Sequence, residues 1–355
     1  MSVFNFKVLG CIMAATVLSS QATLAAVKVG ITMPTQNVER WYLEGPLLSE
    51  KLKAAGYEPS LYYGGDADVA LQVSQVHRMI SEGCSVLVIA PIDGNSFKEA
   101  LKEAKAKHIP VISYDRLIMN SDAVTYYATF DNQEVGRLQA QYLVDSLHLA
   151  SGNNVNLELF AGSSDDNNAH FFWNGSMEVL GPYIASGQIH IKSGNLKEEV
   201  CAIPGWSEDE SLKRTDGLIE QYNYVPGGTK LHGVLCPADV ITGGVIQAFV
   251  KAGFESQNIP VITGQDCDKT GVSNMLKGLQ SMSIFKDTRV LADRVVKMVD
   301  SIAKHEEVEI NDTTTYDNGA IVPKTYLCKP TVVTGRNLKE VLFDSGYYKE
   351  SDFQL

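Results

Sequence analysis

The chain has 355 residues, a formal net charge of −12 at neutral pH and 45% hydrophobic residues. A chain of this length usually forms two domains, and its hydrophobic fraction is ample for two cores. Because an acidic protein repels nucleic acid and anionic lipid, the charge argues against either as a partner.

Residues 1–25 have the pattern of a secretory signal peptide. Lys7 is their only charged residue, the run Val8–Leu18 is apolar, and Thr23-Leu24-Ala25 offers a small-residue cleavage site. Cys11 is an alternative, as a lipid-attachment cysteine, but it lies before the apolar run has finished, so we favour cleavage after Ala25. No stretch is long enough to span a membrane. We therefore expect an exported, periplasmic protein.

From residue 27 onward, short apolar runs alternate with amphipathic stretches, which is the pattern of repeated β-α-β units. Val86-Leu87-Val88-Ile89-Ala90 is a near-continuous apolar strand of the kind that helices cover on both faces. Such repeats favour a parallel sheet with right-handed crossovers. In this first half the expected strands are residues 27–32, 60–63, 86–90 and 110–114, with helices over 39–55, 67–81 and 96–107.

The same pattern then restarts, which favours a second α/β sheet over one oversized sheet. The expected strands are residues 125–130, 156–160, 188–192, 231–235, 260–263, 281–286 and 325–327. Helices are expected over residues 134–149, 168–182, 209–222, 242–252 and 288–304. Periodicity alone does not assign the helix over 288–304 to either sheet.

Polar or aromatic groups stand just beyond many of these strands, at the end that opens onto the ligand crevice of an open α/β sheet. The clearest case is Tyr114-Asp115-Arg116, which places a carboxylate and a guanidinium directly after a buried strand. Burying such charges for packing alone is costly, although a structural ion pair remains an alternative. The other groups are Arg40-Trp41, Asp165-Asp166-Asn167-Asn168, Asp239, Gln265-Asp266 and Lys286.

Helix capping is an alternative role for some of these residues. Asp166 and Asp239 suit the N-cap position of a helix, where aspartate is favoured. Capping does not explain Arg40, Arg116 or Lys286, because cations oppose the dipole at a helix start. The cations therefore point to a ligand or to partners elsewhere in the fold.

The chemistry of this set suits recognition of a sugar better than catalysis. Sugar hydroxyls donate and accept together, so carboxylates, amides and cations can all bind one ring. Charge-assisted hydrogen bonds contribute roughly 1.5–3 kcal/mol each, and four or five of them suffice for micromolar affinity after ordering costs. Trp41 and Trp206 would offer flat apolar surfaces to the faces of the ring, with ordinary packing as the alternative.

Metal and nucleotide chemistry lack their motifs in this sequence. Asp266-Cys267-Asp268 is similar to part of a calcium loop, but the glycine and the bidentate glutamate of such a loop are missing. No Gly-x-Gly-x-x-Gly follows the first strand, and there is no phosphate loop. We therefore expect neither a metal nor a cofactor.

Five cysteines remain after cleavage, and none has the Cys-x-x-Cys spacing of zinc or redox sites: Cys84, Cys201, Cys236, Cys267 and Cys328. An odd number in an exported chain leaves at least one thiol unpaired. The pairing of the others stays open.

At these residues the chain resembles the periplasmic sugar-binding proteins of the xylose-binding and multiple-monosaccharide-binding group. The matching segments follow one another over nearly all of the chain after the signal sequence, which makes the likeness specific. They are Met33-Pro34-Thr35 with Arg40-Trp41, Val88-Ile89-Ala90 with Ile92-Asp93-Gly94, Tyr114-Asp115-Arg116-Leu117-Ile118, Tyr127-Ala128-Thr129-Phe130-Asp131-Asn132, Asp165-Asp166-Asn167-Asn168-Ala169, Gly264-Gln265-Asp266, Ile284-Phe285-Lys286-Asp287-Thr288 and Gly346-Tyr347-Tyr348.

The resemblance implies an α/β fold of two Rossmann-like lobes with parallel sheets, joined by a three-segment hinge. It places residues 26–131 and about 285–323 in the N-terminal lobe, and residues 132–284 and about 324–355 in the C-terminal lobe. One monosaccharide, such as xylose, glucose or galactose, would be clamped between the lobes. The protein would act as a monomer that delivers the sugar to the membrane permease of an ABC importer. A chemotaxis or sensor receptor is a further partner of some relatives.

Position by position, the resemblance implies sugar contacts. Arg40, Asp115, Arg116, Asn168, Asp266 and Lys286 would contact sugar oxygens, Trp41 and Trp206 would lie against the ring faces, and Asp166 would be a second acidic contact. We add Asp239 because it follows a predicted strand. The preceding Ala238 departs from xylose-binding relatives, which have an asparagine there that touches the sugar. This departure favours a hexose-tolerant or multi-sugar site.

Two other protein classes are alternatives. An exported sugar-processing enzyme would use Asp115 and Asp266 as an acid/base pair. The effector domain of a transcription regulator shares the fold, but the signal sequence, the acidic charge and the lack of a basic helix-turn-helix before Val27 argue against it.

Overall fold

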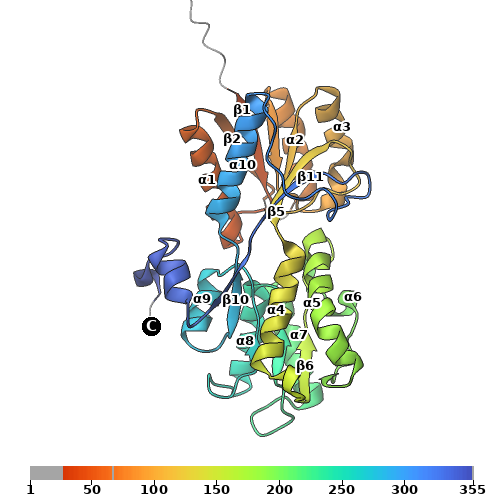
Figure 1. The fold of residues 1–355 in the computed structure, drawn as a ribbon, viewed down its shortest axis with the longest axis vertical. Coiled ribbons are helices and arrows are strands. Elements are labelled where there is room, and N and C mark those ends of the chain that lie inside the picture. Colours follow the sequence, from red (N-terminus) through yellow and green to blue (C-terminus); the bar gives the residue numbers. More distant parts are fainter. Residues whose placement is uncertain (1–26, 66–67, 354–355) are drawn as a thin grey trace, which may run out of the picture.

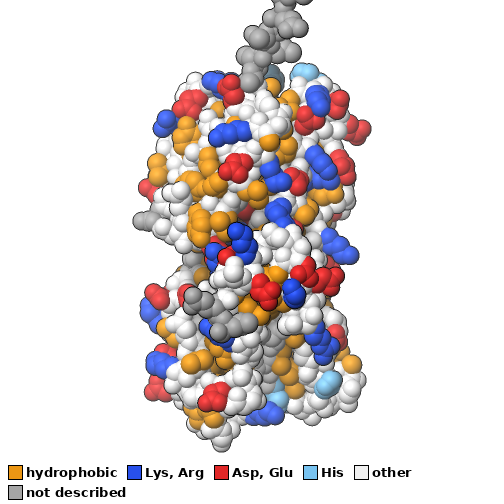
Figure 2. Space-filling model, turned by 90° about the vertical axis from the view of Figure 1, so that its left-hand side faces the viewer, with side chains coloured by type: hydrophobic (Ala, Val, Ile, Leu, Met, Phe, Trp, Pro, Cys, Tyr) orange, Lys and Arg blue, Asp and Glu red, His pale blue; other side chains and the backbone are white. Residues whose placement is uncertain are grey.

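The computed structural model describes residues 27–65 and 68–353, which form two α/β lobes stacked end to end (Figure 1). The predicted signal peptide, residues 1–25, and Cys11 within it lie outside the described residues. In the part of the chain that the structure describes, no helix is long and apolar enough to cross a membrane. Figure 2 shows acidic and basic side chains interspersed over one face of both lobes, unlike the single-sign basic surface that binds nucleic acid.

The N-terminal lobe is built on a parallel sheet with the strand order β11-β5-β4-β3-β1-β2. Its strands are β1 (Lys28–Met33), β2 (Glu58–Tyr63), β3 (Val86–Ile89), β4 (Val111–Tyr114), β5 (Val124–Phe130) and β11 (Lys324–Cys328). Helices α1 (Glu39–Ala54) and α10 (Thr288–Ala303) pack on one face, and α2 (Val69–Ser81) and α3 (Lys98–Ala106), preceded by the 3₁₀ turn η1 (Gly94–Phe97), on the other. Every residue of β3 is buried, as expected for a strand covered on both faces.

The C-terminal lobe has a smaller parallel sheet with the order β7-β6-β8-β9 and an antiparallel pair, β10 with β12. Its strands are β6 (Val155–Leu159), β7 (Ile189–Ile191), β8 (Gly233–Leu235), β9 (Val261–Ile262), β10 (Met282–Phe285) and β12 (Thr331–Thr334). Helices α4 (Asn132–Ser146) and α5 (Asn167–Ala185) cover one face, and α7 (Glu208–Tyr222) and α8 (Asp239–Lys251) the other. The shorter elements are η2 (Leu149–Ser151), α6 (Glu198–Cys201), η3 (Pro204–Trp206), α9 (Lys269–Leu276), η4 (Lys339–Asp344) and η5 (Glu350–Asp352).

Aspartates start many of the helices that follow strands. The side chains of Asp68, Asp131, Asp166, Asp268 and Asp287 each accept a hydrogen bond from an amide of the first turn. Such caps satisfy donors that the helix itself leaves unpaired. Three of them, before α4, α5 and α9, therefore set the helix starts at the interlobe edge of the C-terminal lobe.

Three segments connect the lobes, between β5 and α4, between β10 and α10, and between β11 and β12 (Figure 1). We expected the last crossing near residue 324, and the structure corrects this. β11 pairs with β5 from Lys324 opposite Tyr126 to Cys328 opposite Phe130, so the chain crosses only after Cys328. The correction reflects a pairing between strands nearly 200 residues apart, which local periodicity does not encode. Strand β12 and helix α9 were not anticipated either.

Candidate ligand-binding site

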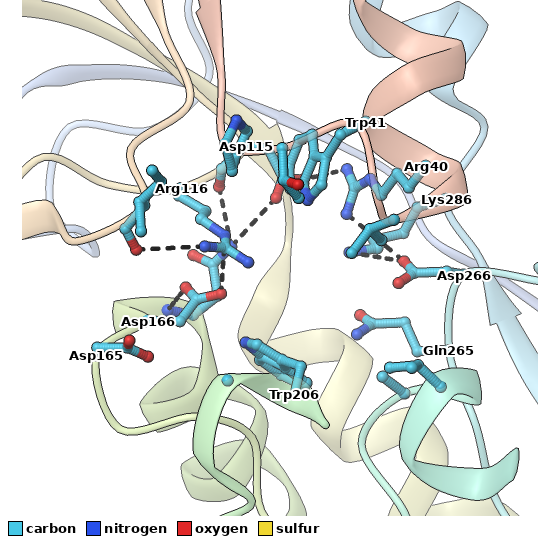
Figure 3. Close-up of a pocket in the computed structure, with 18 of the residues that line it drawn as sticks. Arg40, Trp41, Asp115, Arg116, Asp165, Asp166, Trp206, Gln265, Asp266 and Lys286 are labelled. Atoms are coloured by element: carbon cyan, nitrogen blue, oxygen red, sulfur yellow. Dashed lines mark hydrogen bonds and ion pairs between the residues drawn. The ribbon is translucent and has the colours of Figure 1, made fainter. Parts of the chain in front are cut away.

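A cavity of about 160 Å³ lies between the lobes, at the carboxyl ends of their strands. This is smaller than the roughly 300–1,000 Å³ of pockets for drug-sized ligands, so the space suits a small molecule. Nine of the ten predicted site residues line it: Arg40, Trp41, Asp115, Arg116, Asp166, Asn168, Trp206, Asp266 and Lys286. Figure 3 labels all of these except Asn168 and shows how the labelled side chains converge from both lobes.

Arg40, near the start of α1, connects the acidic groups on one side of the cavity. Its Nη2 pairs with Asp115 Oδ2 and its Nε donates to Glu44 Oε1 at 3.1 Å. Its Nη1 lies 3.6 Å from Asp266 Oδ1, which is also 3.0 Å from Lys286 Nζ. Because Arg40 belongs to the N-terminal lobe and Asp266 to the C-terminal lobe, this ion pair joins the lobes across the cavity.

A second charged contact joins the lobes on the other side of the cavity. Arg116 Nε lies 3.0 Å from Asp166 Oδ2. Asp166 also caps α5 through the amide of Asn168, so the capping alternative holds together with the cavity position. Asn168 Nδ2 in turn donates to the carbonyl of Asp115 at 3.0 Å. Asp166, the cap of α5, and Asn168, in its first turn, thus both bind the loop after β4.

Two indole rings lie on opposite sides of the cavity, Trp41 from α1 and Trp206 from η3 (Figure 3). The guanidinium carbons of Arg40 and Arg116 lie 4.9 and 5.4 Å from the centre of the Trp41 ring. Trp206 packs edge to face against Phe172, with ring centres 6.3 Å apart. Both indole rings therefore line the cavity, and each is also in contact with neighbouring side chains that line it.

Three polar atoms of the lining are buried and have no hydrogen-bond partner among the described residues. One is Asp266 Oδ1, which has ion pairs with Lys286 and Arg40 instead. The other two are Trp206 Nε1 and Gln265 Oε1, whereas Gln265 Nε2 donates to the carbonyl of Pro237 at 3.0 Å. An unpaired buried donor or acceptor costs about 1–3 kcal/mol. A ligand with hydroxyl groups would satisfy both.

The loop after β4 holds Asp115 in an unusual backbone conformation. Its φ is +59°, in the left-handed region that non-glycine residues seldom adopt. Its carbonyl accepts hydrogen bonds from Tyr127 Oη at 2.7 Å, Thr129 Oγ1 at 2.9 Å and Asn168 Nδ2 at 3.0 Å. These three donors fix the backbone, so the carboxylate is presented to the cavity in one orientation.

Burial and neighbouring charges shift the pKa values of the acidic groups in opposite directions. Burial acts to raise the pKa of Asp115, but the Arg40 guanidinium and Lys286 outweigh it, and the pKa lies below its usual value. Burial raises the pKa of Asp166 despite Arg116. Burial also raises the pKa of Glu44, behind Arg40, to about 7. Asp115 is therefore a stable anion at neutral pH, whereas Glu44 titrates there.

Asp239 is the one predicted site residue that the structure places away from the cavity. It is 1% exposed, in the first turn of α8, and its carboxylate accepts hydrogen bonds from Gln280 Nε2 at 2.7 Å, Ser283 Oγ at 2.8 Å and the Asp268 amide at 3.1 Å. Cβ atoms on Gly264 and Gly271 would lie within 2.2 Å of its oxygens. The prediction is therefore wrong for Asp239, which anchors the loop after β9 from behind. The capping alternative is wrong as well, because Ala238 is the N-cap.

Several lining residues are not among the ten predicted site residues: Gln265, Asp165, Ala238, Phe172 and Val240. Asp165 and Gln265 were named among the polar groups beyond the strands, and Ala238 as a departure from xylose-binding relatives, but none of the three was assigned a sugar contact. Gln265 stood inside the motif Gly264-Gln265-Asp266, so its signal was present. Phe172 lies in the apolar stripe of a helix, where nothing distinguishes a lining residue from a core residue.

The five cysteines within the described residues are all free and buried. In the same part of the chain, no group of three or more His, Cys, Asp or Glu side chains is placed to hold a metal ion. Asp266-Cys267-Asp268 forms the turn into α9 instead.

Comparisons with known proteins agree with this architecture. Residues 29–307 match the model of the periplasmic binding protein domain. The multiple sugar-binding periplasmic protein SbpA of Azospirillum brasilense is 43% identical over 337 residues, covering 94% of this chain and 93% of that protein. The D-xylose-binding periplasmic protein of Escherichia coli strain K12 is 31% identical over 326 residues, covering 92% of each chain.

A solved structure is similar over the same length. An ABC transporter solute binding protein from Clostridium phytofermentans, with bound β-D-glucose, is 49% identical and superimposes with a TM-score of 0.88, covering 92% of this chain and all of that one. The predicted resemblance and fold class are confirmed. The chain therefore belongs to the periplasmic binding protein family and has the two-lobed α/β architecture of its type I members.

Proposed function

We propose that the protein captures one neutral monosaccharide between its lobes, with glucose first and galactose and xylose as further ligands. The observation that carries the proposal is one small cavity with an indole ring from each lobe and charged groups around it. Apolar ring faces and a rim of hydroxyls are the two parts of a pyranose that such a lining matches.

The pairing of the charges supports a neutral ligand. Each cation of the lining already has a carboxylate partner: Arg40 with Asp115, Arg116 with Asp166, and Lys286 with Asp266. Hydroxyls can add hydrogen bonds to such pairs without separating them, whereas an acidic sugar would compete with the carboxylates. The unpaired indole N–H of Trp206 needs an acceptor, and the unpaired amide oxygen of Gln265 needs a donor. Sugar hydroxyls can serve as both.

The choice among sugars rests on Ala238 and on the relatives. Ala238 lines the cavity with a methyl group, which cannot hydrogen-bond a sugar and is small enough to leave room for the extra carbon of a hexose. The similar structure from Clostridium phytofermentans holds β-D-glucose, and one relative is named for several sugars. We infer a site that takes hexoses and tolerates pentoses.

The two-lobed architecture supports delivery of the sugar to a membrane partner. A ligand that contacts both lobes favours the closed conformation, and a membrane partner can bind that closed conformation preferentially. We propose the permease of an ABC importer as that partner, in the periplasm, with the protein acting as a monomer. A chemotaxis or sensor receptor is a second partner of the same kind.

The sugar-processing enzyme is the second candidate, and the site chemistry argues against it. Arg40 contacts both Asp115 and Asp266, and it helps to hold the pKa of Asp115 below its usual range. A general acid needs the opposite shift at neutral pH. Binding therefore accounts for the carboxylates better than acid/base catalysis.

Calorimetric titration of the purified protein with D-glucose, D-galactose and D-xylose tests the proposal. We expect one site per chain with a dissociation constant in the micromolar range or below for glucose. Nuclear magnetic resonance of the sugar after prolonged incubation separates the two candidates. Unchanged sugar supports a binding protein, and the lack of binding by any monosaccharide would refute the proposal.

A further inference from the structure

A second, much smaller cavity of about 20 Å³ lies behind the ion pairs of the sugar cavity. Arg40, Asp266 and Lys286 line both cavities and thus form the wall between them. Tyr347 and Tyr348, from the C-terminal segment, line only the small one. That space is sufficient for about one water molecule. The two tyrosines therefore lie on the far side of this wall and do not face the proposed ligand.

Tyr348 reaches the backbone next to Asp266. Its hydroxyl donates to the carbonyl of Cys267 at 3.1 Å, in a buried position. Asp266 and Cys267 both have positive φ values, +93° and +51°, although neither is glycine. Two such residues in succession are strained and persist only where the surroundings hold them.

Three hydrogen bonds hold this strained pair. The Asp266 amide donates to the Ile284 carbonyl at 2.8 Å, and the Cys267 amide donates to Ser283 Oγ at 3.1 Å. Both partners belong to β10. The third is the bond from the Tyr348 hydroxyl, which belongs to a different segment. It binds the carbonyl of Cys267, whereas Ser283 binds the amide of the same residue. Without it, the carbonyl of Cys267 loses its described partner and the turn that aims Asp266 is less constrained.

Tyr347 holds the segment that carries Lys286. Its ring packs edge to face on Phe285, with centres 4.7 Å apart, and its hydroxyl lies 3.2 Å from Thr288 Oγ1. Arg289 adds a contact over the Tyr347 ring at 5.0 Å and donates through Nη1 to the Ser345 carbonyl at 3.0 Å. Residues on both sides of Lys286 are thus fixed to the C-terminal segment, at the crossing between β10 and α10.

We propose that Tyr347 and Tyr348 are positioning residues for sugar binding, with the Tyr348 hydroxyl acting through Asp266 and Tyr347 acting through Lys286. This inference rests on the proposed function. It assigns the C-terminal segment, which lies beside α9 and β10 in Figure 1, a part in the affinity of a site that it does not touch. The ring of Tyr348 also packs on Phe353. A variant that removes only the hydroxyl therefore tests the positioning role without disturbing this ring packing.

The Tyr348→Phe variant tests the hydroxyl while keeping the ring. We expect the dissociation constant for D-glucose to rise about threefold to tenfold, the equivalent of one net hydrogen bond. Tyr224→Phe is the matched control, because Tyr224 is buried in the same lobe and donates to Glu158 at 2.8 Å, away from the cavity. It should lower thermal stability and leave the dissociation constant unchanged. Equal constants for Tyr348→Phe and wild type would overturn the inference.

A double-mutant cycle shows whether Tyr348 acts through Asp266. Asp266→Asn should weaken glucose binding, and adding Tyr348→Phe to it should cause less than about a twofold further loss. The same fold-loss in both backgrounds would show a general structural effect and reject the positioning role. Tyr347→Phe in a cycle with Lys286→Met tests the other arm in the same way.

These experiments distinguish failure of the proposed function from failure of the positioning inference. If wild type binds no monosaccharide, the proposed function fails. If wild type binds glucose and Asp266→Asn weakens binding, but neither tyrosine variant does, only the positioning inference fails.

Discussion

Asp115 and Asp239 both lie just beyond a strand, and both are buried, yet they do different things. Asp115 follows β4 of the N-terminal lobe and pairs with the Arg40 guanidinium at the wall of the cavity. Asp239 follows β8 of the C-terminal lobe and accepts hydrogen bonds from Gln280, Ser283 and a backbone amide. Among the described residues, Asp239 has neutral hydrogen-bond donors and no ion pair with a cation, and it does not line the cavity.

The partners explain why the two carboxyls differ in charge. Cations offset the burial of Asp115, and its pKa lies below the usual value. Burial and the nearby Asp268 raise the pKa of Asp239 well above the usual value, and its neutral donors do not offset this. A buried aspartate with a cation partner is thus kept charged for a ligand, whereas one with neutral donors serves as an internal anchor.

The largest effect should come from Asp115→Ala. We expect at least a 100-fold rise in the dissociation constant for glucose, because a charge-assisted contact is lost and Arg40 loses a partner that orients it. Unfolding without ligand should change little, since Arg40 keeps Glu44 and Asp266 as partners. Calorimetry measures the affinity, and an unaltered constant would remove Asp115 from the site.

Gly162→Ala should weaken binding about tenfold by moving Trp206. An added Cβ would lie 2.2 Å from the Trp206 ring, which is rigid, so the indole must shift from its place at the cavity. Gly217→Ala in α7 is the control, since its Cβ would meet no atom within 4 Å, and it should leave affinity unchanged. If Gly162→Ala binds glucose like wild type, Trp206 does not contribute its ring face.

Stability should depend on pH through the buried carboxyls with raised pKa values. The folded state keeps a proton on Asp239, Asp268 and Glu44 at pH values where the unfolded chain has released it, and the pKa values of Asp268 and Glu44 are about 7. Their contribution is therefore present at low pH and lost as the pH rises from about 4 through 7. Each proton contributes up to about 1.4 kcal/mol per pH unit.

Urea unfolding at pH 5, 6, 7 and 8 measures this slope. Asp239→Asn, which mimics the neutral acid, should flatten it by as much as one proton. Asp115 contributes in the opposite sense, because its lowered pKa gives stability that is lost only in more acidic solution. A slope in Asp239→Asn equal to that of wild type would show that Asp239 is ionised in the folded protein.

The smallest effect is expected for the affinity of Asp239→Asn. The amide retains most hydrogen-bonding capacity toward Gln280 and Ser283, so the loop of Gln265 and Asp266 should keep its shape. We expect less than a threefold change in the dissociation constant for glucose. A loss as large as that of Asp115→Ala would place Asp239 back among the ligand contacts.

Local sequence signals predicted most of the individual elements, though not β12 or α9, and most of the site. The run at 86–90 is a buried strand, and Tyr114-Asp115-Arg116 ends at the cavity, because parallel strands in such sheets all point their carboxyl ends toward the crevice. Arg40, Arg116 and Lys286 were identified because they stand just beyond predicted strands, and capping does not explain cations at helix starts. Nine lining residues followed from those rules and from the family resemblance.

The amino-acid sequence by itself determined the repeated β-α-β units, the aspartate caps and the placement of charged groups at strand ends, because each depends on residues close together in the chain. Tertiary structure alone decided that β11 joins the N-terminal sheet, that Asp239 faces Gln280 and Ser283 rather than the cavity, and that Tyr348 supports the turn at Asp266. Each of these depends on which distant segments meet, and the free energy of such contacts comes from burial and pairing that local patterns do not specify.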